Sequence, residues 1–82
     1  MSGATTTPEV MWRPGCPFCM RLRVGLRLLE VTAHWRNIWE DDEAREFVAM
    51  VNDGNEVVPT VVIDGRPHTN PDPALVKKAL VG

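Results

Sequence analysis

The apolar residues of this 82-residue chain follow a strand-like pattern first and a helical pattern directly after it. Glu9–Trp12 is a short apolar segment that predicts a strand, and the Pro and Gly at positions 14 and 15 end it. From Cys16 to about Val31 the apolar residues recur at helical spacing. One face holds Cys19, Leu22, Leu26 and Leu29, and a wider stripe adds Met20, Val24 and Leu28. A stripe this wide predicts a helix packed against a sheet.

The chain then repeats this alternation with a second strand and a second helix. Ala33–Trp39 is rich in β-branched and aromatic residues, which favour strands. The acidic run at residues 40–43 stands where a helix would begin, because negative charge and an Asp cap stabilise the amino end of a helix. The apolar face of this helix consists of Ala44, Phe47, Val48 and Val51. Gly54 predicts its end.

The last third of the chain predicts two strands and a helix. Val57–Ile63 is apolar enough for a strand, although Pro59 interrupts it. Asp64-Gly65 is typical of a tight hairpin turn, and Arg66–Thr69 would be the returning strand. Asp72 as a cap and Pro73 as the first helical residue predict a final helix.

These elements predict one α/β domain with the order β-α-β-α-β-β-α. The first two strands should be parallel because a helix connects them, whereas the last two should form an antiparallel hairpin. The fold would therefore be a four-stranded mixed sheet with three helices covering both faces. We expect the domain to span residues 9–82, after a disordered N-terminal tail at residues 1–8.

Composition excludes several classes of protein. Apolar residues make up 44% of the chain, too many for a disordered chain, and two cysteines are too few for a disulfide scaffold. The formal charge of −2 disfavours a nucleic-acid binder, and no apolar run reaches the length of a membrane span. Because the N-terminus lacks the features of a secretory signal, we expect a cytoplasmic protein. In that compartment a pair of cysteines more often performs chemistry or binds metal than cross-links a fold.

The two cysteines form a Cys-x-x-Cys motif between the first strand and the first helix. Cys16 stands at the predicted amino end of the helix, where unpaired backbone N–H groups favour a thiolate. Arginines add positive charge, since residues 13–36 contain five of them and one acid, Glu30. A thiolate is the species that attacks disulfides, so the motif predicts a thioredoxin-like redox site with Cys16 as nucleophile.

Cys19 has two possible roles. It lies on the apolar stripe, so it can be an inert core cysteine, or it can be the resolving thiol that closes a disulfide with Cys16; we favour the second because of the spacing. A metal site is the main rival use of both cysteines, with His34 and His68 as the other ligands. The second His does not have the spacing found in zinc fingers, so we expect no metal.

Cys16-Pro17-Phe18-Cys19 together with Val57-Val58-Pro59 resembles the glutaredoxin branch of the thioredoxin superfamily. This resemblance covers nearly all of the chain and implies a thioredoxin-like (glutaredoxin) fold. It further implies a cis bond between Val58 and Pro59, opposite the active site. The backbone of Val58 would then pair with the cysteinyl part of a bound low-molecular-weight thiol.

Several less specific motifs are similar to those of the actinobacterial mycoredoxins, which use mycothiol in place of glutathione. These motifs are Val51–Asn55, Val58–Val61, Asp64-Gly65 and Thr69–Pro71. Glutathione-using relatives usually carry a Gly-Gly-x-Asp segment where this chain has residues 69–72. The chain departs from the mycoredoxin pattern at Gly15 and Val57. The expected thiol-binding residues are Arg13, Phe18, Val58, Pro59, Thr69, Asn70 and Asp72.

The resemblance implies a thiol–disulfide oxidoreductase with no tightly bound cofactor, and we expect a monomer because nothing in the sequence demands a larger assembly. Its co-substrate would be mycothiol or glutathione, and its partners would be S-thiolated proteins, with neither nucleic acid nor membrane involved. Alternatives remain open. One is a redoxin that is reduced by thioredoxin reductase and donates electrons to ribonucleotide reductase. The others are a metal or iron–sulfur binding module and an interaction domain whose thiols are idle.

Overall fold

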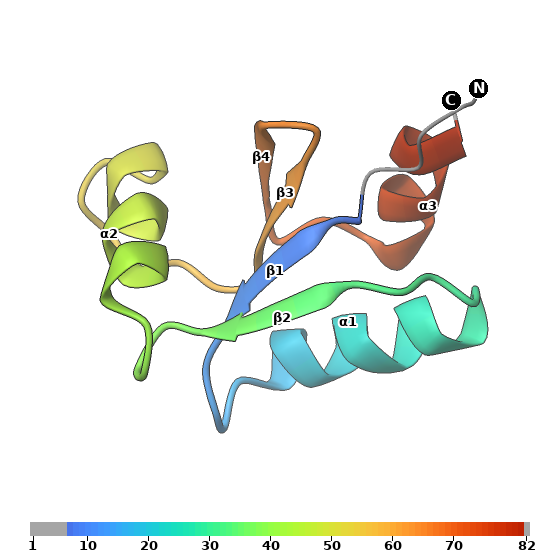
Figure 1. Ribbon diagram of the computed structural model, residues 1–82. Coiled ribbons are helices and arrows are strands. Elements are labelled where there is room, and N and C mark those ends of the chain that lie inside the picture. Colours follow the sequence, from blue (N-terminus) through green and yellow to red (C-terminus); the bar gives the residue numbers. More distant parts are fainter. Residues whose placement is uncertain (1–6, 82) are drawn as a thin grey trace.

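The computed structural model describes residues 7–81, and its elements follow the predicted order. They are β1 (Glu9–Trp12), α1 (Pro17–Leu28), β2 (His34–Asn37), α2 (Asp42–Val51), β3 (Thr60–Ile63), β4 (Arg66–Thr69) and α3 (Pro73–Val81). The four strands form one sheet in the order β2-β1-β3-β4 (Figure 1). β1 and β2 are parallel, whereas β1–β3 and β3–β4 are antiparallel, as predicted. Within residues 7–81, none of the helices has the length and apolar character needed to cross a membrane.

Helices cover both faces of the sheet, and successive residues of β1 supply both cores. Val10 faces α1 and α3, and Met11 faces α2, because side chains alternate along a strand. The core on the side of α1 and α3, here called the aliphatic cluster, consists of Val10, Leu22, Leu26, Val61, Ile63 and Val76. The core that includes α2, here called the cysteine cluster, consists of Met11, Cys16, Cys19, Ile38, Ala44, Val48 and Val58.

Gly25 allows α1 and α3 to pack closely. A Cβ atom at this position would overlap Cγ of Pro73, the first residue of α3, so any larger residue would push the helices apart. A glycine inside a helix costs about 1 kcal/mol relative to alanine. The close contact explains why glycine stands there despite that cost.

The first helix ends earlier than the predicted Val31. α1 stops at Leu28, and Glu30 adopts a left-handed backbone with φ of 57°. The N–H of Glu30 donates to the Arg27 carbonyl at 3.1 Å, and the N–H of Val31 donates to the Leu26 carbonyl at 2.8 Å. This pair of hydrogen bonds is a Schellman motif, with Glu30 at the position that glycine usually occupies.

Two predicted strands are too long. β3 begins at Thr60 rather than Val57, because Pro59 has no N–H for the ladder and the Thr60 hydroxyl donates to the Val57 carbonyl at 2.8 Å. β2 covers residues 34–37 rather than 33–39. The backbone N–H of Trp39 donates to Oδ1 of Asn37 at 2.9 Å, which turns the chain out of the sheet.

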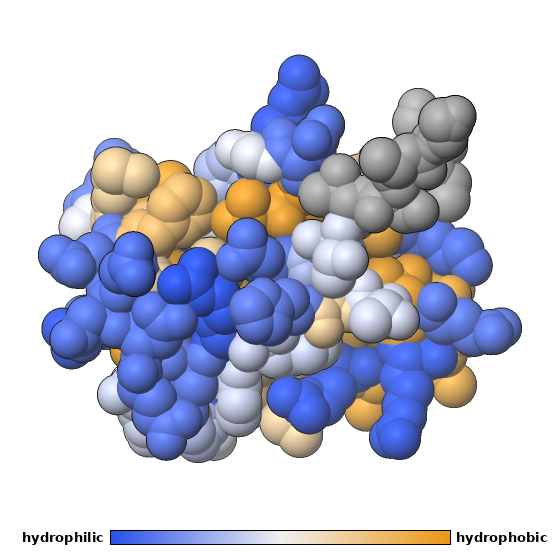
Figure 2. Space-filling model, in the orientation of Figure 1, coloured by the Kyte–Doolittle hydropathy of each residue, from blue (hydrophilic) through white to orange (hydrophobic). Residues whose placement is uncertain are grey.

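The wide apolar stripe predicted for the first helix is only partly buried. Its core consists of Cys19, Leu22 and Leu26, whereas Met20, Val24 and Leu28 are 49%, 56% and 79% exposed. These exposed residues follow one another at four-residue spacing on the side of α1 away from the sheet. Apolar patches show among hydrophilic side chains over the region of α1 (Figure 2).

The chain is packed against the sheet one residue before position 9, where the sequence predicts the domain to begin. Pro8, which the sequence placed at the end of the tail, is buried, and its carbonyl accepts a hydrogen bond from the His34 N–H at 2.8 Å. The chain is therefore already packed against the rest of the fold at Pro8. Of the tail predicted at residues 1–8, residues 1–6 lie outside the described residues.

Candidate functional site

A tight turn and a helix start bring Cys16 to its position. Gly15 has φ of +78°, a backbone conformation that side chains other than glycine rarely adopt, and it reverses the chain after β1. Cys16 follows as the N-cap of α1 with an extended backbone, and Pro17 occupies the first helical turn. The Sγ atom of Cys16 accepts a hydrogen bond from the Cys19 N–H at 3.4 Å. The thiol therefore performs the capping role that Ser or Asp performs in other helices.

The surroundings of Cys16 favour its thiolate. Burial by itself raises the pKa of this thiol, but hydrogen bonds from the side chain and the backbone N–H of Cys19 lower it. The backbone N–H of Phe18 and the positive charge of Arg13 lower it further. The net effect is a pKa of Cys16 below its ordinary value of 9.0, which raises the reactive fraction near neutral pH.

Cys19 has the opposite protonation preference. It lies on the buried side of α1 with 1% of its surface exposed. Burial, followed by its hydrogen bond to Cys16, raises the pKa of Cys19 to about 12. The two cysteines of the motif therefore form an asymmetric pair, in which one sulfur is a nucleophile and the other a proton-bearing donor.

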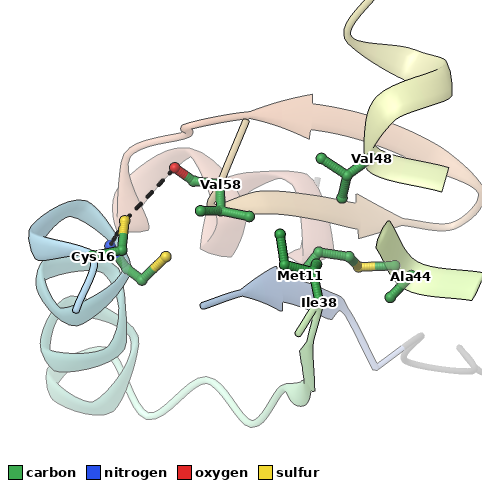
Figure 3. Close-up of a cluster of buried hydrophobic side chains, with 7 residues drawn as sticks. Met11, Cys16, Ile38, Ala44, Val48 and Val58 are labelled. Atoms are coloured by element: carbon green, nitrogen blue, oxygen red, sulfur yellow. Dashed lines mark hydrogen bonds between the residues drawn. The ribbon is translucent and has the colours of Figure 1, made fainter. Parts of the chain in front are cut away.

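Val58 faces the Cys16 sulfur across the site. Cys16 Sγ lies 3.8 Å from the Val58 carbonyl oxygen and points toward it (Figure 3). The bond between Val58 and Pro59 is cis, as the resemblance implied. Both residues are buried, so the backbone of Val58 is the part of this segment that faces the thiol.

Three of the expected thiol-binding residues line one groove. Phe18, Asn70 and Asp72 are brought together there, and the remaining lining residues are Arg21, Leu22, Pro71 and Pro73. Phe18 is 54% exposed, so its ring is available to a bound molecule. The groove joins the start of α1 to the segment between β4 and α3.

The other expected residues have different surroundings. The guanidinium of Arg13 donates to the Pro14 carbonyl at 3.5 Å and contributes positive charge at Cys16. The hydroxyl of Thr69 donates to Oδ1 of Asn52 at 2.7 Å. Sequence reasoning missed both Asn52 and the groove residue Arg21. Asn52 belongs to one of the motifs shared with mycoredoxins, but neither periodicity nor motif indicated its side-chain contacts.

The arginines near the cysteines are not equivalent. Arg36 donates to Asp41 at 2.8 Å and to Glu9 at 3.1 Å, so its charge is already paired. Arg23 stacks over the Trp12 and Trp35 rings, at 5.2 Å and 4.5 Å from their centroids. Arg13 lowers the pKa of Cys16 and Arg21 lines the groove, so these two arginines place positive charge at the candidate site.

The metal set considered from the sequence is not assembled. His34 lies on β2 and His68 on β4, which are the two opposite edges of the sheet. Within the part of the chain that the structure describes, no group of three or more His, Cys, Asp or Glu residues is placed to hold a metal ion.

Comparison with known proteins agrees with this geometry. The sequence pattern of the glutaredoxin family matches residues 2–68. A Mycobacterium tuberculosis protein provisionally named a glutaredoxin is 37% identical over 82 residues, covering 99% of this chain and 94% of that protein. Mycoredoxin 1 of Corynebacterium glutamicum is 46% identical over 57 residues, covering 68% of this chain and 70% of that protein.

Solved structures give the same fold. A crystal structure of a thioredoxin-like protein superposes with a TM-score of 0.75 at 27% identity, covering 90% of this chain and all of that one. The solution structure of a glutaredoxin from Brucella melitensis superposes with a TM-score of 0.70 at 19% identity, covering 93% and 83% of the two chains. The fold is thus thioredoxin-like, with an asymmetric pair of cysteines at the start of its first helix. This chain belongs to the glutaredoxin family of thiol–disulfide oxidoreductases.

Proposed function

We propose that this protein reduces mixed disulfides between proteins and mycothiol, with Cys16 as the nucleophile. The observation that carries the proposal is the placement of the Cys16 sulfur. It caps α1, has a lowered pKa and lies 3.8 Å from the Val58 carbonyl oxygen. A thiolate in that position can attack a disulfide whose other atoms lie along the Val58 backbone.

The reaction consists of two thiol–disulfide exchanges. The Cys16 thiolate attacks the mycothiol sulfur of the mixed disulfide, and the target protein leaves as a thiolate that takes up a proton. Cys16 is then joined to mycothiol. A second mycothiol, as its thiolate, attacks the mycothiol sulfur of this adduct and forms mycothiol disulfide. Cys16 leaves as a thiolate, so the disulfide bond has passed from the target protein to mycothiol disulfide: the target sulfur is reduced to a thiol and the sulfur of the incoming mycothiol is oxidised.

Cys19 offers a second way to resolve the mixed disulfide between Cys16 and mycothiol. Its sulfur attacks Cys16, releases mycothiol and leaves a Cys16–Cys19 disulfide. The raised pKa of Cys19 keeps it protonated near neutral pH, so this attack requires loss of its proton. We therefore expect the route through a second mycothiol to dominate when that thiol is plentiful.

The groove between the start of α1 and residues 70–73 offers groups that suit a thiol with polar substituents. Phe18 offers an apolar surface, while Asn70 and Asp72 offer polar groups that can meet hydroxyl or amide groups. Arg13, whose positive charge lowers the pKa of Cys16, would meet a polar part of the ligand. The 46% identity to mycoredoxin 1 favours mycothiol over glutathione, and no metal or tightly bound cofactor is required.

Intact mass of a Cys19→Ser variant tests this proposal, because the variant traps the adduct on Cys16. The protein is exposed separately to mycothiol disulfide and to glutathione disulfide. We expect a mycothiol adduct to form faster than a glutathione adduct. A preference for glutathione would make the protein a glutathione-dependent glutaredoxin. An absence of both adducts would favour a redoxin that is reduced by thioredoxin reductase.

A further inference from the structure

The side chain of Asn52 connects three elements that are separate in the sequence. Its Nδ2 donates to the Val48 carbonyl at 2.8 Å and to Oγ1 of Thr60 at 3.3 Å. Its Oδ1 accepts from the hydroxyl of Thr69 at 2.7 Å. One amide therefore joins the last turn of α2 to the first residue of β3 and the last residue of β4.

Both strand ends lead directly to the candidate site. The Thr60 hydroxyl donates to the Val57 carbonyl at 2.8 Å, which fixes the segment whose Val58 carbonyl faces Cys16. On the other strand, Thr69 is followed by Asn70, where a φ of 48° turns the chain toward the groove. The N–H of Asn70 donates to the Pro59 carbonyl at 2.7 Å, so the two segments also contact each other.

We propose that Asn52 is a positioning residue that sets the spacing between the Val58 segment and the groove segment at residues 70–72. This proposal rests on the proposed function, because a thiol bound at Cys16 would have to contact both segments. Thr60 and Thr69 are partners at the end of the β3–β4 ladder, where strand pairs open most readily. Asn52 bridges these two hydroxyls and thereby resists that opening.

In this arrangement Thr69 acts by holding Asn52 and not by contacting the bound thiol. A hydroxyl has one hydrogen to donate, and that of Thr69 is given to the Asn52 amide oxygen. Thr69 therefore cannot donate to a bound thiol without releasing Asn52. Loss of the hydroxyl should weaken binding of the bulky thiol but leave the pKa of Cys16 unchanged, because neither residue contributes to it.

Thr69→Val tests the proposal, since valine has nearly the shape of threonine and only the hydroxyl is lost. Hydrogen exchange of the Asn70 amide is measured first, in the free protein. We expect it to quicken by about fivefold or more, the ratio for losing one hydrogen bond of ordinary strength. For whichever thiol disulfide the wild-type protein accepts, KM should rise by a similar factor of about five, with kcat nearly unchanged.

Two control variants make the result decisive. Thr69→Ser keeps the hydroxyl, so its Asn70 exchange rate and its KM should be close to those of the wild type. Asn55→Ala removes a side chain that contacts Asn52 only at its backbone carbonyl, and should change neither value. Unchanged Asn70 exchange in Thr69→Val would overturn the proposal. Because exchange is measured without a thiol, it decides the role of Asn52 even if neither mycothiol nor glutathione reacts with Cys16.

Discussion

The aliphatic cluster and the cysteine cluster both take residues from β1 and α1, but their compositions differ. The aliphatic cluster holds only Val, Leu and Ile side chains, closed in by α1, α3 and the sheet. The cysteine cluster instead holds two thiols and a thioether, together with Ile38, Ala44, Val48 and Val58. The reactive sulfur is thus part of a core. We infer that stability depends mainly on the first cluster and reactivity on the second.

Replacing Cys16 with serine should have the largest effect on activity and a small effect on stability. We expect reduction of a mixed disulfide to fall by more than about a thousandfold, because a serine hydroxyl is not ionised near neutral pH and is a far weaker nucleophile. The free energy of unfolding should stay within about 1 kcal/mol of that of the wild type. Enzyme assay and urea unfolding check the two parts. Substantial activity in Cys16→Ser would mean that Cys19, and not Cys16, is the nucleophile.

Leu26→Ala should show the reverse behaviour. Leu26 is 1% exposed in the aliphatic cluster, so removing its side chain should lower the free energy of unfolding by about 2–4 kcal/mol. The alkylation rate of Cys16 in folded protein should not change. Leu28→Ala is the matched control on the same helix, because Leu28 is 79% exposed and its loss should cost less than about 0.5 kcal/mol. Equal losses of stability in the two variants would contradict the assigned burial.

Gly25→Ala tests the contact between α1 and α3 at Pro73, which also lines the groove. The new methyl group would overlap Pro73, which belongs both to the α1–α3 contact and to the groove beside Phe18. After the gain in helix propensity, we expect a net loss of about 1–3 kcal/mol in stability and a higher KM for the thiol disulfide. The stability loss should shrink in a Pro73→Ala background, measured as a double-mutant cycle. If the stability losses of Gly25→Ala and Pro73→Ala were additive, the new methyl group would not be in conflict with Pro73.

The sequence predicted the parts of this fold that depend on local signals. β1 and β4 have their predicted bounds, and Cys16 stands at the helix start because Pro14, Gly15 and Pro17 mark that boundary locally. Features that depend on tertiary contacts were not predictable. Periodicity could not tell that Val24 faces solvent while Leu22 and Leu26 are buried, because all three are apolar. The pairing of Gly25 with Pro73 joins residues 48 positions apart, and no local rule relates them.

The same limit applies to the candidate site. The motif identified both cysteines, and the resemblance supplied Val58 and the groove residues Phe18, Asn70 and Asp72. Asn52 was missed because its role depends on hydrogen bonds to strands that come later in the chain. Residue identity alone also cannot give the balance between burial and hydrogen bonding that sets the two thiol pKa values apart.

Cys19→Ala should have the smallest effect, and it separates the contributions to the Cys16 thiolate. The side chain of Cys19 lowers the pKa of Cys16, whereas the backbone N–H groups of Cys19 and Phe18 remain in the variant. The pKa of Cys16 should therefore rise, which moves the midpoint of its alkylation by iodoacetamide to higher pH and slows the reaction near neutral pH. Burial then raises the pKa against the backbone donors and Arg13 alone, and if these donors are the main source of stabilisation, the midpoint should remain below 9.0. A midpoint above 9.0 would mean that the Cys19 thiol, rather than the helix start, is the main source of thiolate stabilisation.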